Sequence, residues 1–129
     1  MRRAVAAVTV SVAADGDEAQ SVAARMVDGL GVYGLKTVEQ SSQPDVLIEL
    51  SGEGRRLPIE NLTWFTARGK LSVKMSYGST GEVFKRFEES GEVSAGSPRT
   101  CVRVVLTRLA SRAADTAYTV LTTASALDD

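Results

Sequence analysis

The chain has 129 residues, of which 43% are hydrophobic and 24% are charged, and its formal net charge is −1. This size and composition predict a single globular domain, 1–129, and the charge disfavours a dedicated nucleic-acid or membrane-surface protein, because such binding draws on a basic excess. Histidine is absent and Cys101 is the one cysteine, which excludes an internal disulfide and catalysis by Ser-His-Asp or Cys-His groups. No apolar run is long enough to predict a transmembrane segment. We therefore expect no enzyme, no metal site and no cofactor.

The first elements alternate between a strand pattern and a helix pattern. Residues 4–12 predict a strand, because valines recur at every second position. Asp-Gly-Asp-Glu at 15–18 predicts a turn and the start of a helix, capped by Asp15 or Asp17. Apolar residues at helical spacing then predict a helix that runs to about Asp28.

A glycine-rich segment, 29–34, follows this helix. We interpret it as a C-cap and turn, because a phosphate-binding loop must precede a helix rather than follow one. Short strands are expected at 35–39 and 46–50. Pro58 has no N–H and is expected to interrupt a central strand, so the segment around it is predicted to be irregular.

The strongest strand signal lies at 62–77. Leu71, Val73 and Met75 alternate with Ser72 and Lys74, which predicts one covered face and one wet face, as in antiparallel sheets. The turn Gly-Ser-Thr-Gly then returns the chain through 83–94. Since Phe84 and Phe87 have opposite parity in this returning strand, one of them is expected to point outward.

The last helix is predicted to begin at Pro98 with Ser97 as its cap. Cys101, in its first turns, is interpreted as a structural thiol. The helix carries an apolar stripe of Val102, Val105, Leu106, Leu109, Ala113, Ala117, Val120 and Leu121. The predicted fold is therefore α+β (an α/β sandwich): a mixed, largely antiparallel sheet of four or five strands, two helices on one face, and the order β-α-β-β-β-β-α.

The hairpin 77–94 is the leading candidate site for a protein partner. Its charged side chains are either a recognition surface or solvated edge residues that prevent aggregation, and both interpretations stay open. The predicted contact residues on it are Phe84, Lys85, Arg86 and Glu88. A homo-oligomer is left open as well.

A second group of candidates lies near the middle of the chain. Arg68, Lys70 and Lys74, together with Arg55 and Arg56, form a basic set that would contact an acidic partner from the wet face. An RNA-binding sheet is a weaker hypothesis, because such a surface needs exposed aromatic residues for stacking. Trp64 and Phe65 are adjacent, so only one faces the core, and Trp64 is predicted to be an interface residue.

The alternative function is a small-ligand-binding domain that uses arginine and carboxylate groups in a cleft between sheet and helix. A deep pocket lined by Arg55, Arg56 or Glu60 would favour this alternative. The carboxylates form no recognisable acid–base pair, so an enzymatic version has no support in the residues.

Two stretches resemble one group of bacterial proteins. They are PDVLIELSGEG, at 44–54, and KLSVKMSYGSTGEVFKRFEESGEVS, at 70–94, whose turn contains Thr80-Gly81-Glu82-Val83. With the helix that follows, they resemble envelope domains of the TolB amino-terminal-like fold. This group includes the middle domain of the flagellar assembly protein T, the curli secretion protein G and the LpoB activator of peptidoglycan synthases.

The resemblance implies a bacterial, periplasmic and non-catalytic domain that docks to a protein partner in a cell-envelope assembly. A cytoplasmic location is the alternative. The resemblance transfers no catalytic residue to this chain.

Overall fold

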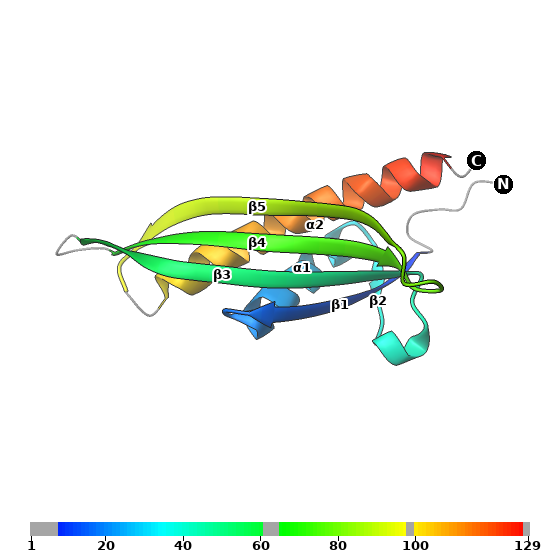
Figure 1. Cartoon of the computed structure of the whole chain (residues 1–129), viewed down its shortest axis with the longest axis horizontal. Helices are drawn as coiled ribbons and strands as arrows, with labels where there is room; N and C mark the ends of the chain where they lie inside the picture. Colours follow the sequence, from blue (N-terminus) through cyan, green and yellow to red (C-terminus); the bar gives the residue numbers. More distant parts are fainter. Residues whose placement is uncertain (1–7, 61–64, 98–99, 128–129) are drawn as a thin grey trace.

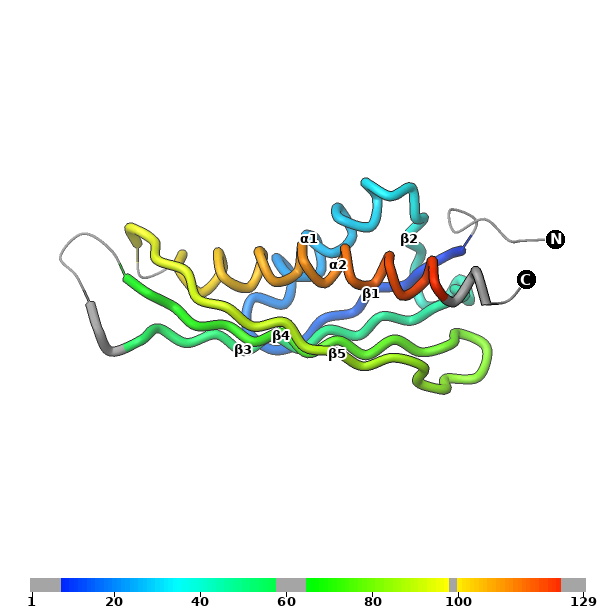
Figure 2. Tube along the Cα trace, turned by 90° about the horizontal axis from the view of Figure 1, so that it is seen from above, coloured from blue at the N-terminus to red at the C-terminus, as the bar shows by residue number. Residues whose placement is uncertain are grey.

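The computed structural model describes residues 8–60, 65–97 and 100–127. Five strands form one sheet, and two helices lie on the same face of it (Figures 1 and 2). The predicted α+β fold, with both helices on one face, is confirmed. The elements are β1 (Thr9–Gly16), α1 (Ala19–Val32), β2 (Lys36–Thr37), the 3₁₀ helix η2 (Gln40–Ser42), β3 (Val46–Glu60), β4 (Phe65–Tyr77), β5 (Val83–Ala95) and α2 (Cys101–Leu127).

The sheet has the strand order β2-β1-β3-β4-β5. β1 is parallel to both β2 and β3, whereas β3, β4 and β5 form antiparallel pairs. The sheet is therefore mixed and largely antiparallel, as predicted. α1 makes the crossover from β1 to β2, and α2 returns along β3, β4 and β5. The face opposite the helices, called here the open face, is covered by no helix of the described residues.

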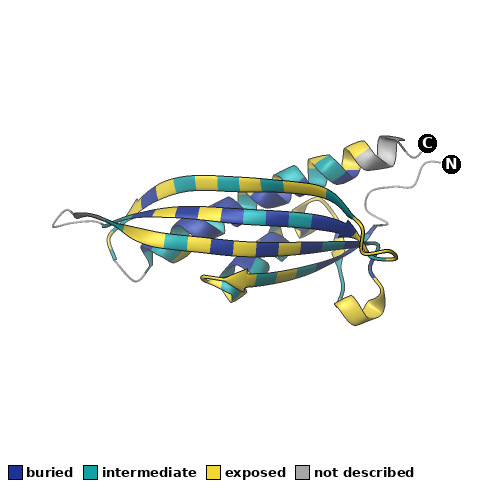
Figure 3. Cartoon of the chain, in the orientation of Figure 1, coloured by how far each residue is buried: buried dark blue, intermediate teal, exposed yellow. Residues whose placement is uncertain are grey.

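The core lies between the helices and the sheet. Leu71, Val73 and Met75 of β4 are almost completely buried and face α2, while their even-numbered neighbours lie on the open face. Figure 3 shows this alternation of buried and exposed residues along the strands. From α2 the core receives Cys101, Val105, Leu106, Leu109, Ala110, Ala113, Ala114, Ala117 and Leu121. The predicted stripe is confirmed, and Cys101, interpreted as a structural thiol, is buried in this core.

A row of glycines lets α2 lie close to the sheet. Gly54, Gly69 and Gly91 are cross-strand neighbours in β3, β4 and β5. A Cβ atom on Gly69 would lie only 3.0 Å from Cγ1 of Val105, and one on Gly54 would lie 2.5 Å from Cγ1 of Val102. The missing side chains thus set the depth at which the helix packs.

The start of α1 differs from the prediction. β1 continues to Gly16 instead of ending at residue 12, and the N-cap is Glu18 in the left-handed region, with no side-chain cap hydrogen bond. Asp17 acts elsewhere: its N–H donates to the carbonyl of Gly52 (2.8 Å) and its carboxylate accepts from the N–H of Gly54 (2.9 Å). The predicted cap is wrong because Asp17 joins the end of β1 to β3.

The end of α1 also differs. The helix passes through Gly29 and Gly31 and ends at Val32, so the predicted end near Asp28 is wrong. Gly29 faces Ala114 of α2 so closely that a Cβ atom there would lie 2.6 Å from the alanine Cβ. Close packing of the two helices outweighs the low helix propensity of glycine. Gly34, at φ 82°, makes the turn after the helix.

β3 runs through Pro58 to Glu60, although the sequence predicts an irregular segment there. The pairing of β1 with β3 stops at Gly16 and Gly52, so this end of β3 has only β4 beside it among the described strands. Proline has no N–H to donate, and it is tolerated at such an edge because no neighbouring strand requires a donor there. The register shift between Arg56 and Glu60 is the irregularity that remains.

Candidate interaction surface

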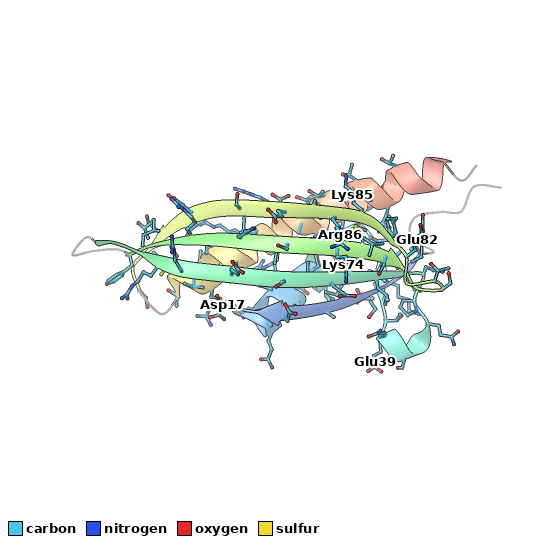
Figure 4. The ribbon with its side chains drawn as sticks, in the orientation of Figure 1. Asp17, Glu39, Lys74, Glu82, Lys85 and Arg86 are labelled. Atoms are coloured by element: carbon cyan, nitrogen blue, oxygen red, sulfur yellow. The ribbon has the colours of Figure 1, made fainter. Side chains whose placement is uncertain are left out.

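The open face is lined by both acidic and basic side chains. Strand register places Lys74 between Glu49 and Arg86, and it places Arg68 between Arg55 and Glu92. Figure 4 shows Lys74 and Arg86 on neighbouring strands of this face. The charged residues that share it are Asp15, Glu49, Glu53, Arg55, Arg68, Lys70, Lys74, Arg86, Glu88 and Glu92.

Among the described residues, three ion pairs cross the strands on this face. Their N–O distances are 2.6 Å for Arg68–Glu92, 3.3 Å for Lys74–Glu49 and 3.4 Å for Lys70–Glu88. All six side chains are substantially exposed, so each pair stabilises the fold by less than about 1 kcal/mol. The predicted basic residues of β4 are therefore flanked by carboxylates of β3 and β5, and the face carries both charge signs.

Arg55 and Arg56 do not share one surface. Arg55 lies opposite Arg68 on the open face, whereas the guanidinium of Arg56 lies 5.5 Å from the ring centroid of Phe65, on the helix side of the sheet. The predicted basic set is thus split between two faces. Arg55 and Arg56, two of the residues named for a cleft between sheet and helix, therefore do not share a pocket, since consecutive strand residues point to opposite faces. Trp64 lies outside the described residues.

The returning strand of the hairpin contains a bulge at Phe84. Val83 pairs with Ser76 and Lys85 pairs with Met75, so Phe84 is the extra residue. Its ring contacts Tyr77, with 4.5 Å between ring centroids. Phe84 and Phe87 are both partly buried against the core, so the expectation that one points outward is wrong. The bulge changes the parity on which that expectation was based.

Lys85 and Arg86 follow this bulge and point to opposite sides of the sheet. Both are exposed, and neither has an ion-pair partner among the described residues. Arg86 borders a depression of about 450 Å³ on the open face. Its polar lining comes from Lys74, Glu88, Glu49, Asp15, Ser51 and Ser72.

An aromatic pair on the helix layer is absent from the sequence prediction. Tyr33, just after α1, stacks on Tyr118 of α2 with 4.1 Å between ring centroids and 7° between ring planes. The Tyr33 hydroxyl donates to Oδ1 of Asp115 (2.6 Å). Asp115 and Tyr118 are three residues apart, a spacing that puts them on one helix face, but their approach to Tyr33 depends on how the helices pack.

The hydrogen bond to Asp115 raises the pKa of Tyr33 above its ordinary value of 10.0, because an anionic acceptor favours the neutral phenol. A phenol whose pKa is higher in the folded state stabilises the fold at every pH below its unfolded pKa, and this stabilisation is lost as pH rises through the folded pKa.

We expect Asp115→Asn to lower the pKa of Tyr33. Ultraviolet titration of the phenolate band measures it, and Tyr77→Phe combined with Tyr118→Phe leaves Tyr33 as the one tyrosine of the chain. An unchanged titration would contradict the contact.

The described residues, 8–60, 65–97 and 100–127, contain no cluster of three or more His, Cys, Asp or Glu side chains able to hold a metal ion. Over the same ranges, neither helix combines the length and the apolar character that crossing a bilayer demands.

Several solved structures share this fold. A minor lipoprotein from Acinetobacter baumannii is 10% identical, with a TM-score of 0.62 over 89% of this chain and 90% of that one. PelC from Paraburkholderia phytofirmans, described as a dodecamer, is 15% identical, with a TM-score of 0.60 over 87% and 89%. Rare lipoprotein B from Shewanella oneidensis is 13% identical, with a TM-score of 0.55 over 94% and 99%.

No protein-family model matches the sequence, and no curated protein matches it. The similarity is therefore one of fold, and it extends over nearly the whole of each chain. The chain has the fold of a group of bacterial lipoproteins, which confirms the resemblance to an envelope-domain fold that the sequence suggests.

Proposed function

We propose that this protein is a non-catalytic interaction module of a bacterial cell-envelope assembly, located in the periplasm. It binds a protein partner through the open face and through β5, with Arg86, Lys74 and Glu88 as central contacts. Arg68 and Lys70 extend this surface along β4, and Phe84, Lys85 and Trp64 complete the set of proposed contact residues.

The observation that carries the proposal is the uncovered, two-sign face of the sheet. Basic side chains of β4 lie between carboxylates of β3 and β5, with Arg55 and Arg86 adding a cation at opposite ends of the flanking strands. A protein surface with the opposite pattern can match such a face, and this charge complementarity gives specificity and sets the register. A polyanion such as nucleic acid would meet a carboxylate beside nearly every cation. The fold shared with lipoproteins supports the envelope location.

A small anionic or zwitterionic ligand is the second candidate. The depression beside Arg86 holds about 450 Å³, within the range of ligand sites, and it offers both charge signs. In this second candidate the ligand lies on the open face rather than in a cleft between sheet and helix. A ligand bound there would raise the unfolding temperature of the isolated protein.

The test is a charge reversal on β5. In a cross-linked pull-down from the native host, we expect Lys85→Glu/Arg86→Glu to lose envelope proteins that the wild type captures. Arg103→Glu/Arg108→Glu, on exposed positions of α2, is the matched control with the same change in charge. The control should capture the partners as the wild type does. Equal capture by all three proteins would refute binding through β5.

A further inference from the structure

The outer edge of β1 is only partly covered. β2 pairs with β1 at Thr9 and Val10, and the N–H of Val38 adds a hydrogen bond to the carbonyl of Val10 (2.8 Å). β1 continues to Gly16, and no described strand lies beside this second half (Figure 1). The sheet therefore has an open edge from Val12 onward.

The direction of the backbone groups along this edge follows from three hydrogen bonds. The carbonyl of Val10 faces β2, whereas the N–H groups of Thr9 and Asp17 face β3, where they donate to Oδ2 of Asp45 and to the carbonyl of Gly52. Since successive residues of a strand direct their N–H and C=O to opposite sides, even-numbered residues point outward. Val12 and Ala14 thus present two donors and two acceptors to the open edge.

Two hollows flank the same edge. One, of about 710 Å³, extends around the edge from Ser11 and Ala13 to the helix side, where Val12, Val27 and Val38 line it. The other, of about 350 Å³, lies on the open face and is lined in part by Ser11 and Ala13. A strand added to β1 would place alternate side chains in the two hollows.

The charge of these hollows indicates which side chains an added strand should carry. Their charged lining consists of Glu39 on one side and of Asp15 and Glu49 on the other, and no lysine or arginine of the described residues lines either hollow. The fitting occupant is therefore an extended segment that carries basic and apolar residues.

β5 of a second copy meets this description. Its first residues, Val83–Phe87, are apolar and basic, and β5 is the opposite edge of the sheet. Register across the sheet puts Lys85 level with Val12 and Arg86 level with Ala13. β5 also runs in the same direction as β1, since β1 is parallel to β3 and the two intervening pairs are antiparallel.

We propose that a second copy of this chain adds β5, through Val83–Glu88, as a parallel strand on the edge of β1 from Val12 to Asp15. Arg86 then lies on the open face near Glu49 of the neighbouring copy, and Lys85 lies on the helix side near its Glu39. This deepens the proposed function, on which it rests, by naming one partner of β5. The contact joins two different surfaces, so repetition yields a ring or a filament rather than a closed dimer.

Two variants block the edge of β1. Ala14→Pro removes an outward N–H that no strand of the monomer uses, so the fold is expected to survive. Ala13→Arg leaves the backbone intact and puts a cation opposite Arg86, on an exposed position of the open face. Ala13→Pro is the matched control, since it removes an inward N–H that faces β3 and should destabilise the fold. Lys85→Glu/Arg86→Glu blocks the other surface.

Sedimentation velocity tests the contact. We expect the wild type to form species heavier than the monomer as concentration rises, and each blocked variant that circular dichroism shows to be folded to remain monomeric. An equimolar mixture of Ala14→Pro and Lys85→Glu/Arg86→Glu should form dimers and nothing larger, because the intact β5 edge of the first variant can add to the intact β1 edge of the second, whereas the reverse contact is blocked on both sides.

Three results would overturn the proposal: a monomeric wild type at its highest soluble concentration, unchanged assembly in the variants, or a mixture that stays monomeric. The proposed function is separable from it. In the pull-down, capture of envelope proteins by Ala13→Arg but not by Lys85→Glu/Arg86→Glu would show that a different protein binds β5, whether or not the chain associates with itself.

Discussion

Gly16→Ala is expected to lower the free energy of unfolding by roughly 2–4 kcal/mol. Gly16 has φ 85°, in the left-handed region that a residue with a Cβ atom adopts at a cost. A Cβ atom there would also collide with the carbonyl oxygen and the nitrogen of Gly52. These are backbone atoms of β3, so no side-chain rotation relieves the clash. Urea unfolding followed by circular dichroism measures the loss.

Gly81→Ala separates the two causes. Gly81 has φ 75° in the turn of the hairpin, but a Cβ atom there would meet no other atom within 4 Å. Only the backbone cost remains, about 1–2 kcal/mol. If both variants lost the same stability, the close approach of Gly16 to Gly52 would be wrong.

Leu106→Ala is expected to cost about 2–5 kcal/mol of stability. The side chain of Leu106 is completely buried and lies over Gly52, Gly54 and Gly69 of the sheet. Glycines have no side chain that could move into the gap, so the cavity should persist. The midpoint of urea unfolding should fall while its slope stays constant, because the surface exposed on unfolding barely changes.

Val32→Ala is the matched control for an apolar truncation. Val32 is 84% exposed at the end of α1, so its shortening should change stability by no more than about 0.5 kcal/mol. A loss at Val32 equal to the loss at Leu106 would contradict the position of the core between α2 and the sheet.

Local patterns predict the elements whose burial repeats regularly. The alternation of Leu71, Val73 and Met75 sets the buried face of β4, and the spacing of Val105, Leu109 and Ala113 sets the buried stripe of α2. The two-residue period of β4 and the helical period of α2 both arise because each element is covered on one face. These periods can be detected from the sequence without knowing which element packs on that face.

The remaining features depend on partners distant in the sequence. β1 extends to Gly16 because β3 pairs with it, and α1 extends past Gly29 because Ala114 of α2 lies against that glycine. Likewise, Phe84 faces the core because a register shift against β4 inserts one residue. A window of sequence around each residue contains none of these partners.

The candidate site follows the same division. Parity alone assigns Arg68, Lys70 and Lys74 to the wet face, and the structure places them there. Their pairing with Glu92, Glu88 and Glu49 requires the register of β3, β4 and β5. The open edge of β1 exists because β2 is only two residues long, a length that the sequence overestimates.

The most direct test of the interaction role is site-specific photocross-linking in the native host. A photoreactive residue at Arg86, on β5, is compared with one at Arg103, on the exposed side of α2. The account predicts cross-links to protein from position 86 and at most background from position 103. Equal yields at the two positions, or none from position 86, would contradict a binding surface on β5 and the open face.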